Sequence, residues 1–134
     1  MRYVPTAVRI LLGLLFNFSG LNGLFHFAPM PPMAGPTATV MAGFAASRYL
    51  FPLIFGTQVV GGVLLLVGRF VPLGLALLAP VVVNIFLFHL ALTPPAPVAF
   101  LVLFAEIFLA WSYRDAFRPM LAMNAKPSLA NPAA

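Results

Sequence analysis

The sequence contains no cysteine and few charged residues, and each shortage excludes a class of protein. Without cysteine there can be no disulfide, no thiolate metal site, no thiol redox chemistry and no covalently attached c-type haem. Charged residues make up only 7% of the 134 positions, too few to cover the surface of a soluble domain. The basic residues are also too scattered to form a stripe that binds nucleic acid.

Sequence patterns typical of soluble enzymes are missing as well. There is no glycine-rich phosphate loop, no nucleophile elbow, no metalloprotease helix and no pair of neighbouring carboxylates. We therefore expect a protein that is not an enzyme on its own. The sequence identifies no catalytic residue and no metal site.

Apolar residues, by contrast, make up 63% of the chain, and the mean hydropathy is +1.07. A surface of this composition is stable against lipid rather than water, so the lipid bilayer is the expected solvent. A helix needs about 20 apolar residues to cross a hydrocarbon core of about 30 Å. The stretches that reach or approach this length are residues 6–27, 50–67, 70–92 and 98–113.

Prolines mark where these stretches begin, at Pro5, Pro52, Pro72 and Pro97. Proline is tolerated in the first helical turn because the missing N–H would have no intrahelical partner there. Between the first two stretches, residues 37–49 have the apolar spacing of a shorter helix, which we expect in the membrane interface. The predicted fold is all-α: an integral membrane four-helix bundle with a short interfacial helix between the first and second spans.

The basic residues predict the orientation of these spans. With four spans, one side of the membrane carries Arg2, Arg9, Arg69, Arg114, Arg118 and Lys126. The other side carries only Arg48, so the positive-inside rule places both termini in the cytoplasm. We expect residues 1–118 to form the transmembrane domain, in a bacterial inner membrane, and residues 119–134 to form a disordered cytoplasmic tail.

Polar side chains within the apolar stretches are the candidates for a ligand-binding site, because a polar group in lipid must find a partner or line a cavity. These candidates are Glu106, Gln58, Asn84, Asn22, His89 and His26. With a helical rise of about 1.5 Å per residue, Gln58 and Glu106 come near the midplane and the other four lie in the outer half. If all six point inward, they form one cluster that opens toward the outside.

Each candidate also has a structural interpretation. Glu106 is either a ligand anchor or proton-handling group, or a protonated acid that hydrogen-bonds Gln58 or Asn84 between helices. For Gln58 and Asn84 an interhelical hydrogen bond is the alternative to ligand binding. His26 and His89 could hold a haem or a metal, or could cap polar loops at the surface.

Small residues predict where helices approach closely. Asn17 points away from the other polar residues of its stretch and aligns with Gly13 and Gly20, so we expect it to face a different helix. The paired glycines Gly61 and Gly62 would let a neighbouring backbone come close beside Gln58.

Three runs of the sequence resemble the DoxX-like family of small bacterial membrane proteins. They are RILLGLLFNFSGLNGLFHF, PLIFGTQVVGGVLLLVGRFVPLGLALLAPVVVNIFLFH and YRDAFRPML. The more specific features are a GRF-x-P turn, from Gly68 to Pro72, and the APVVVN-x4-H pattern that follows it. The resemblance implies a four-helix inner-membrane protein related to subunits of quinone-linked oxidoreductases or of stress-response complexes. Many relatives carry an acid before the paired glycines, where this sequence has Gln58.

The leading functional hypothesis is an accessory membrane subunit that binds an amphipathic molecule, such as a quinone, through its polar cluster. A membrane oxidoreductase is then a candidate partner, and the chain could also form a homo-oligomer. One alternative is a small oligomeric transporter or channel subunit that uses Glu106. Another is a haem-binding electron carrier that uses His26 and His89, although two histidines without a recognised spacing do not define a haem site.

Overall fold

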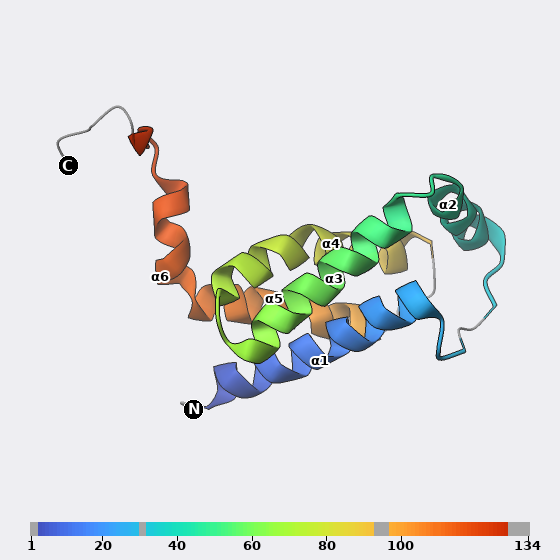
Figure 1. Ribbon diagram of the computed structural model, residues 1–134, viewed down its shortest axis with the longest axis horizontal. Helices are drawn as coiled ribbons and strands as arrows, with labels where there is room; N and C mark the ends of the chain where they lie inside the picture. Colours follow the sequence, from blue (N-terminus) through green and yellow to red (C-terminus); the bar gives the residue numbers. More distant parts are fainter. Residues whose placement is uncertain (1–2, 30–31, 93–96, 129–134) are drawn as a thin grey trace.

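The computed structural model describes residues 3–29, 32–92 and 97–128, and all regular elements in those ranges are helices (Figure 1). They are α1 (Val4–Phe25), α2 (Gly35–Ala46), α3 (Leu50–Val67), α4 (Val71–Ala91), α5 (Pro97–Ser112), α6 (Arg114–Phe117) and the 3-10 helix η1 (Arg118–Leu121). The all-α prediction is confirmed for these residues. Arg2 and the end of the predicted tail, residues 129–134, lie outside the described ranges.

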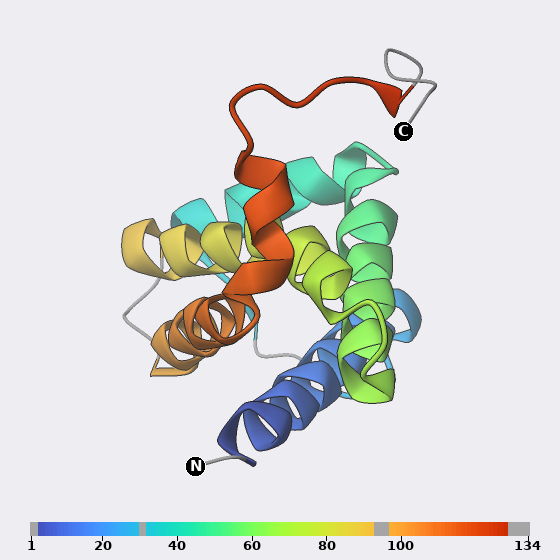
Figure 2. The same cartoon turned by 90° about the vertical axis from the view of Figure 1, so that its left-hand side faces the viewer.

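Four of the helices pack in a ring. Helix α1 contacts α3 and α5, and α4 contacts the same two helices, as seen from one end in Figure 2. We call that end, which holds the N-terminus, the α3–α4 turn and α6, the terminal end. Helix α2 contacts α3 and lies across the opposite end, which we call the α2 end. The core between the helices consists of Leu12, Phe16, Leu65, Val71, Leu75, Leu78, Val82, Val102 and Leu109.

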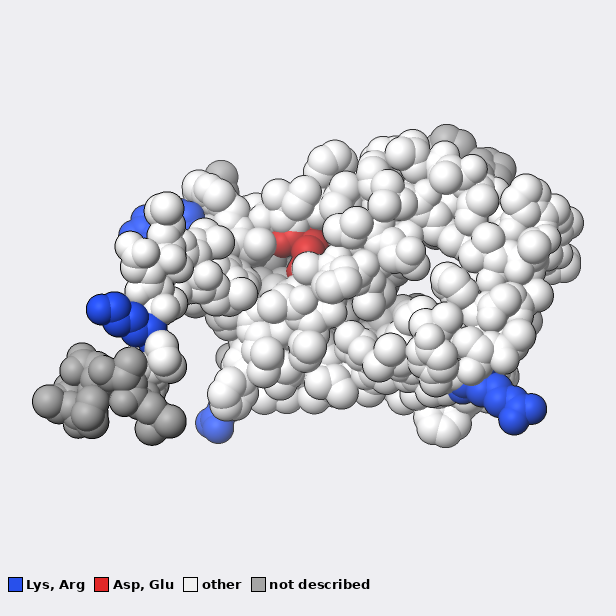
Figure 3. Space-filling view, turned by 90° about the horizontal axis from the view of Figure 1, so that it is seen from above, with Lys and Arg blue, Asp and Glu red and all other residues white. Residues whose placement is uncertain are grey.

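The outward faces of these helices are apolar. Large side chains such as Leu11 and Phe104 are 66% and 61% exposed, as expected for residues whose solvent is lipid. In Figure 3 the basic side chains lie toward the two ends of the molecule, and the surface between them is uncharged except for one acidic patch in a hollow.

Three helices, α1, α3 and α4, are long and apolar enough to cross a membrane. The predicted fourth span, residues 98–113, corresponds to α5, which has 16 residues and is too short to be a candidate span by itself. It reaches the required length only together with α6 and η1, from which it is bent by 77°. The described residues therefore contain three candidate spans, or four if this bent pair counts as one.

Side chains from other helices satisfy two of the helix ends. At the end of α3, Gly68 takes a left-handed conformation (φ 77°) and its N–H donates to the carbonyl of Leu64. Arg9 of α1 donates to the carbonyls of Leu65 and Leu66, which have no partner within α3. A cation at this position also interacts favourably with the helix dipole.

The end of α4 is held in a similar way by α2. The hydroxyl of Thr37, which is 8% exposed, donates to the carbonyl of Leu92 over 2.9 Å. Leu92 is the C-terminal cap residue of α4, so its carbonyl has no partner within that helix. This bond ties the start of α2 to the end of α4.

The backbones of helices α1 and α3 lie in close contact, with no side chains between them at the glycine positions. A Cβ atom at Gly13 would lie 3.0 Å from the carbonyl oxygen of Gly62, and one at Gly20 would lie 2.8 Å from that of Phe55. Asn17 lies on the same face: its amide donates to the carbonyl of Gly13, and a Cβ at Gly62 would be 2.7 Å from the amide nitrogen. Asn17 thus faces α3 together with Gly13 and Gly20. The prediction that it faces a different helix from the rest of the polar residues is wrong at Gly23, which meets Phe55 of the same helix.

We expect Gly20→Ala to lower the free energy of unfolding by about 1–3 kcal/mol, because the added methyl group meets a backbone oxygen that cannot move without shifting α3. Gly56→Ala is the matched control, since a Cβ there meets nothing within 4 Å. Thermal unfolding in mild detergent, followed by far-UV circular dichroism, measures both. Equal melting temperatures for the two variants would contradict the close α1–α3 contact.

Candidate functional site

The six polar candidates do not all point inward, so they do not form the single cluster that would follow if they did. Asn22, Gln58 and Glu106 are buried, at 8%, 4% and 6% exposure. Asn84 and His26 are exposed, and His89 is intermediate. The expectation was wrong for Asn84 in particular, because this residue lies on the outer face of α4. Its helix is apolar on every side, so periodicity gave no sign of which face is inward.

Gln58 and Glu106 are buried polar groups that lack hydrogen-bond partners. The Oε1 atom of Gln58 and the Oε2 atom of Glu106 have no donor within the described part of the chain. No hydrogen bond joins Glu106 to Gln58 or to Asn84, so the expected interhelical bond is absent between them. Leaving a buried acceptor unpaired costs about 1–3 kcal/mol. These two oxygen atoms are therefore free to accept a hydrogen bond from a group outside the described residues.

Asn22 has a structural role at the end of α1. Its Oδ1 atom accepts a hydrogen bond of 2.8 Å from the N–H of Ala28, which lies in the chain beyond the helix. His26 caps α1 in a left-handed conformation (φ 53°), and its N–H donates to the Asn22 carbonyl over 2.7 Å. The Asn22 side chain thus fixes the turn that presents His26.

His89 lies near the end of α4, apart in sequence from the turn that holds His26. Its Nδ1 atom is 2.8 Å from the carbonyl of Ile85, one turn earlier in the same helix. The ring also makes an edge-to-face contact with Phe88, at 5.9 Å between ring centres. No group of three or more His, Cys, Asp or Glu side chains that could hold a metal occurs in the described residues.

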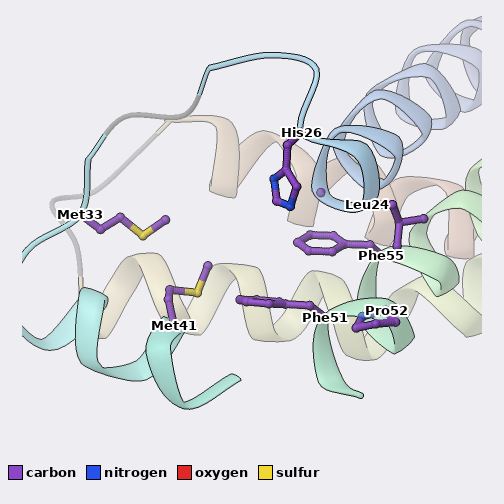
Figure 4. A pocket seen from close by; sticks show the side chains of 8 residues that line it. Leu24, His26, Met33, Met41, Phe51, Pro52 and Phe55 are labelled. Atoms are coloured by element: carbon purple, nitrogen blue, oxygen red, sulfur yellow. The ribbon is translucent and has the colours of Figure 1, made fainter. Parts of the chain in front are cut away.

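A groove at the α2 end brings together residues from α1, α2, α3 and the segment between α1 and α2 (Figure 4). Its volume is about 380 Å³, and it is partly open. The residues that line it are Gly23, Leu24, His26, Met33, Met41, Phe51, Pro52 and Phe55. His26 is the only one of the six polar candidates among them, and it contributes the only ionisable side chain.

The aromatic wall of the groove comes from α3. The rings of Phe51 and Phe55 are stacked, with centres 5.4 Å apart and planes inclined by 20°. Gly23 of α1 makes room for this wall, because a Cβ there would lie 2.5 Å from the Phe55 ring. Our reading of the sequence missed this site. The four-residue spacing of Phe51 and Phe55 could have shown that they share a helix face, whereas Met33 and Met41 follow no pattern that marks a cavity.

Comparison with known proteins found one match, to a protein family. The model of the DoxX family matches residues 4–90, which is more than half of the chain and contains α1, α2, α3 and nearly all of α4. Helix α5, with Glu106, lies outside the matched region. No curated protein and no solved structure matches the chain.

Glu106→Leu should raise the free energy of unfolding by about 1–3 kcal/mol, because it replaces a buried, unpaired oxygen with an apolar group of similar volume. Glu106→Gln, which keeps a polar group at this position, is the control and should not stabilise the protein. Melting temperatures in detergent measure the difference. A destabilised Glu106→Leu variant would mean that the carboxyl group has a partner in the purified protein.

Proposed function

Because the chain belongs to the DoxX family, we propose that it is an accessory subunit of the bacterial inner membrane that binds an amphipathic, quinone-like molecule in the groove at the α2 end. The family and the three or four apolar helices indicate a multi-pass membrane protein. A membrane oxidoreductase is the partner that such a ligand would imply. The subunit itself carries out no chemical step in this proposal.

The proposed topology has α1, α3, α4 and α5 as four spans of a transmembrane bundle, with α2 in the interface. The terminal end then faces the cytoplasm, because it carries Arg9, Arg69, Arg114 and Arg118. Among the basic residues that the structure describes, Arg48, between α2 and α3, is the one that lies toward the opposite end. Trp111 supports this placement, since the Arg114 guanidinium lies 4.3 Å from its ring centre, in a pairing suited to the membrane boundary.

The observation that carries the proposed function is an apolar groove with stacked phenyl rings and one imidazole (Figure 4). Its volume of about 380 Å³ lies within the range of small-molecule sites, which is about 300–1,000 Å³. A planar ring can pack against Phe51 and Phe55, and the His26 ring can donate a hydrogen bond to a carbonyl oxygen. A lipid-soluble molecule with a carbonyl-bearing ring meets both requirements.

His26→Ala should weaken the binding of a short-chain ubiquinone by about five- to tenfold, the loss expected for one hydrogen bond of about 1–1.4 kcal/mol. His89→Ala is the matched control, because His89 does not line the groove. Equilibrium titration of the purified protein in lipid nanodiscs measures both affinities. The proposal fails if the unchanged protein does not bind the quinone, or if the two variants lose the same affinity.

A second candidate function is a transporter or channel subunit, and the unpaired oxygens of Gln58 and Glu106 favour it. Buried ionisable groups within membrane helices often mark the path of a proton or ion. Under this function, proteoliposomes would show proton uptake that Glu106→Gln abolishes and His26→Ala leaves intact. Uptake equal in Glu106→Gln and the unchanged protein would exclude a role for the carboxyl group.

A further inference from the structure

Asn84 places a polar amide on the outer face of α4, at a depth where the surrounding solvent would be lipid. It lies seven residues before Ala91, the last residue of α4, so its backbone is about 10 Å inside that helix end. The side chain is exposed, and it makes no hydrogen bond within the described part of the chain. The Asn84 amide can therefore hydrogen-bond only with a group that lies against this face of the helix.

An unpaired amide is costly at this depth, because hydrocarbon offers neither donors nor acceptors. The neighbours of Asn84 on the same helix face are Leu77, Pro80 and Leu87, whose side chains cannot hydrogen-bond. The unpaired oxygens of Gln58 and Glu106 are buried within the helix ring, whereas Asn84 points away from it. None of the described residues supplies a partner for this amide, which points to a neighbouring molecule.

The exposed residues around Asn84 follow the spacing of a helix–helix contact. They recur at intervals of four and three positions: Leu73, Leu77, Pro80, Asn84 and Leu87. We call these five residues the α4 stripe. Alternation of four and three is the pattern by which two helices pack at a small crossing angle. The leucines of the stripe are 37–53% exposed, so the whole stripe is available to a neighbour.

A shallow groove of about 380 Å³ adjoins the stripe and would receive side chains from a neighbouring helix. It is lined by Pro52, Leu53, Gly56, Thr57 and Val60 of α3 and by Leu77 of the stripe. Gly56 adds to its depth, because the space above its Cα is open for at least 4 Å. The stripe and this groove meet at Leu77. The Thr57 hydroxyl in the groove donates to the Leu53 carbonyl, so the Asn84 amide is the polar side chain of this surface that has no partner among the described residues.

We propose that the α4 stripe is the interface with a second copy of this chain, in which two Asn84 side chains hydrogen-bond to each other across a twofold axis. An amide carries both a donor and an acceptor, so two identical amides related by twofold symmetry satisfy each other. Asn84 is the one polar residue of the stripe, so this pairing leaves no polar side chain of the stripe without a partner. The ligand groove contains no residue of the stripe and shares only Pro52 with the shallow groove, so the interface does not require the proposed ligand.

Energy transfer between labelled copies in phospholipid vesicles tests this interface. The chain has no cysteine, so Asn124→Cys in the exposed C-terminal segment provides a single labelling position. We expect the otherwise unchanged chain to dimerise, and Asn84→Leu to weaken dimerisation at least about threefold, the effect of losing one interhelical hydrogen bond in a membrane. Asn84→Gln, which keeps an amide, should retain more of the association than Asn84→Leu.

Phe104→Leu on the outward face of α5 is the matched control, because Phe104 is 61% exposed but lies away from the stripe. It should dimerise as the unchanged chain does. Far-UV circular dichroism should show the same helix content in all variants, so that a weaker dimer is not a folding defect. A chain that stays monomeric at every protein-to-lipid ratio, or an Asn84→Leu variant that dimerises normally, would overturn the proposal.

Oxidative crosslinking gives a second measurement that does not rely on removing Asn84. Leu77→Cys and Leu87→Cys lie on the stripe, and Leu101→Cys lies on α5. We expect disulfide-linked dimers from the two stripe variants and none from the α5 variant under the same oxidation. Crosslinking that is equal at Leu101, or capture of the stripe by a different protein in place of a second copy, would contradict the proposed interface.

Discussion

Hydrocarbon cannot hydrogen-bond, so a protein within a bilayer has to satisfy its own polar groups. This constraint explains the contacts that hold the helices together here. The carbonyls at the end of α3 are bonded by Arg9 of α1, and the carbonyl of Leu92 after α4 is bonded by Thr37 of α2. In the turn after α1, the N–H of Ala28 donates to the Asn22 side chain. Helices that are apolar on every side are thereby fixed in position by polar contacts at their ends.

The polar side chains that have no hydrogen-bond partner are the candidates for function. Gln58 and Glu106 keep unpaired oxygens inside the helix ring, and Asn84 presents its amide outside it. A structure that satisfies its helix ends so thoroughly would gain stability by replacing such groups with leucine or valine. We propose that their partners are groups that the described residues do not supply: a proton or solute within the ring, and a second copy of the chain outside it.

The sequence was sufficient to place α1 to α5 within a few residues, because apolar length and initiating prolines are local features. It did not predict α6 or η1. It also gave the direction of Asn17, since two glycines on the same face served as a reference. The direction of Asn84 could not be predicted, because leucine and valine surround it on every side of α4. The 77° bend after α5 and the groove beside His26 depend on contacts between distant segments. Helical periodicity describes only local sequence, so it predicted neither.

The contact between Arg9 and the end of α3 also bears on the order in which the protein is assembled. The two bonded residues, Arg9 and Leu65, are 56 positions apart, so α1 is synthesised long before the carbonyl that accepts its guanidinium. Until then, only water or lipid phosphate groups can bind the Arg9 guanidinium. This charge therefore keeps the start of α1 at the boundary between membrane and water. The contact between Arg9 and the end of α3 can therefore form only after α3 has been synthesised.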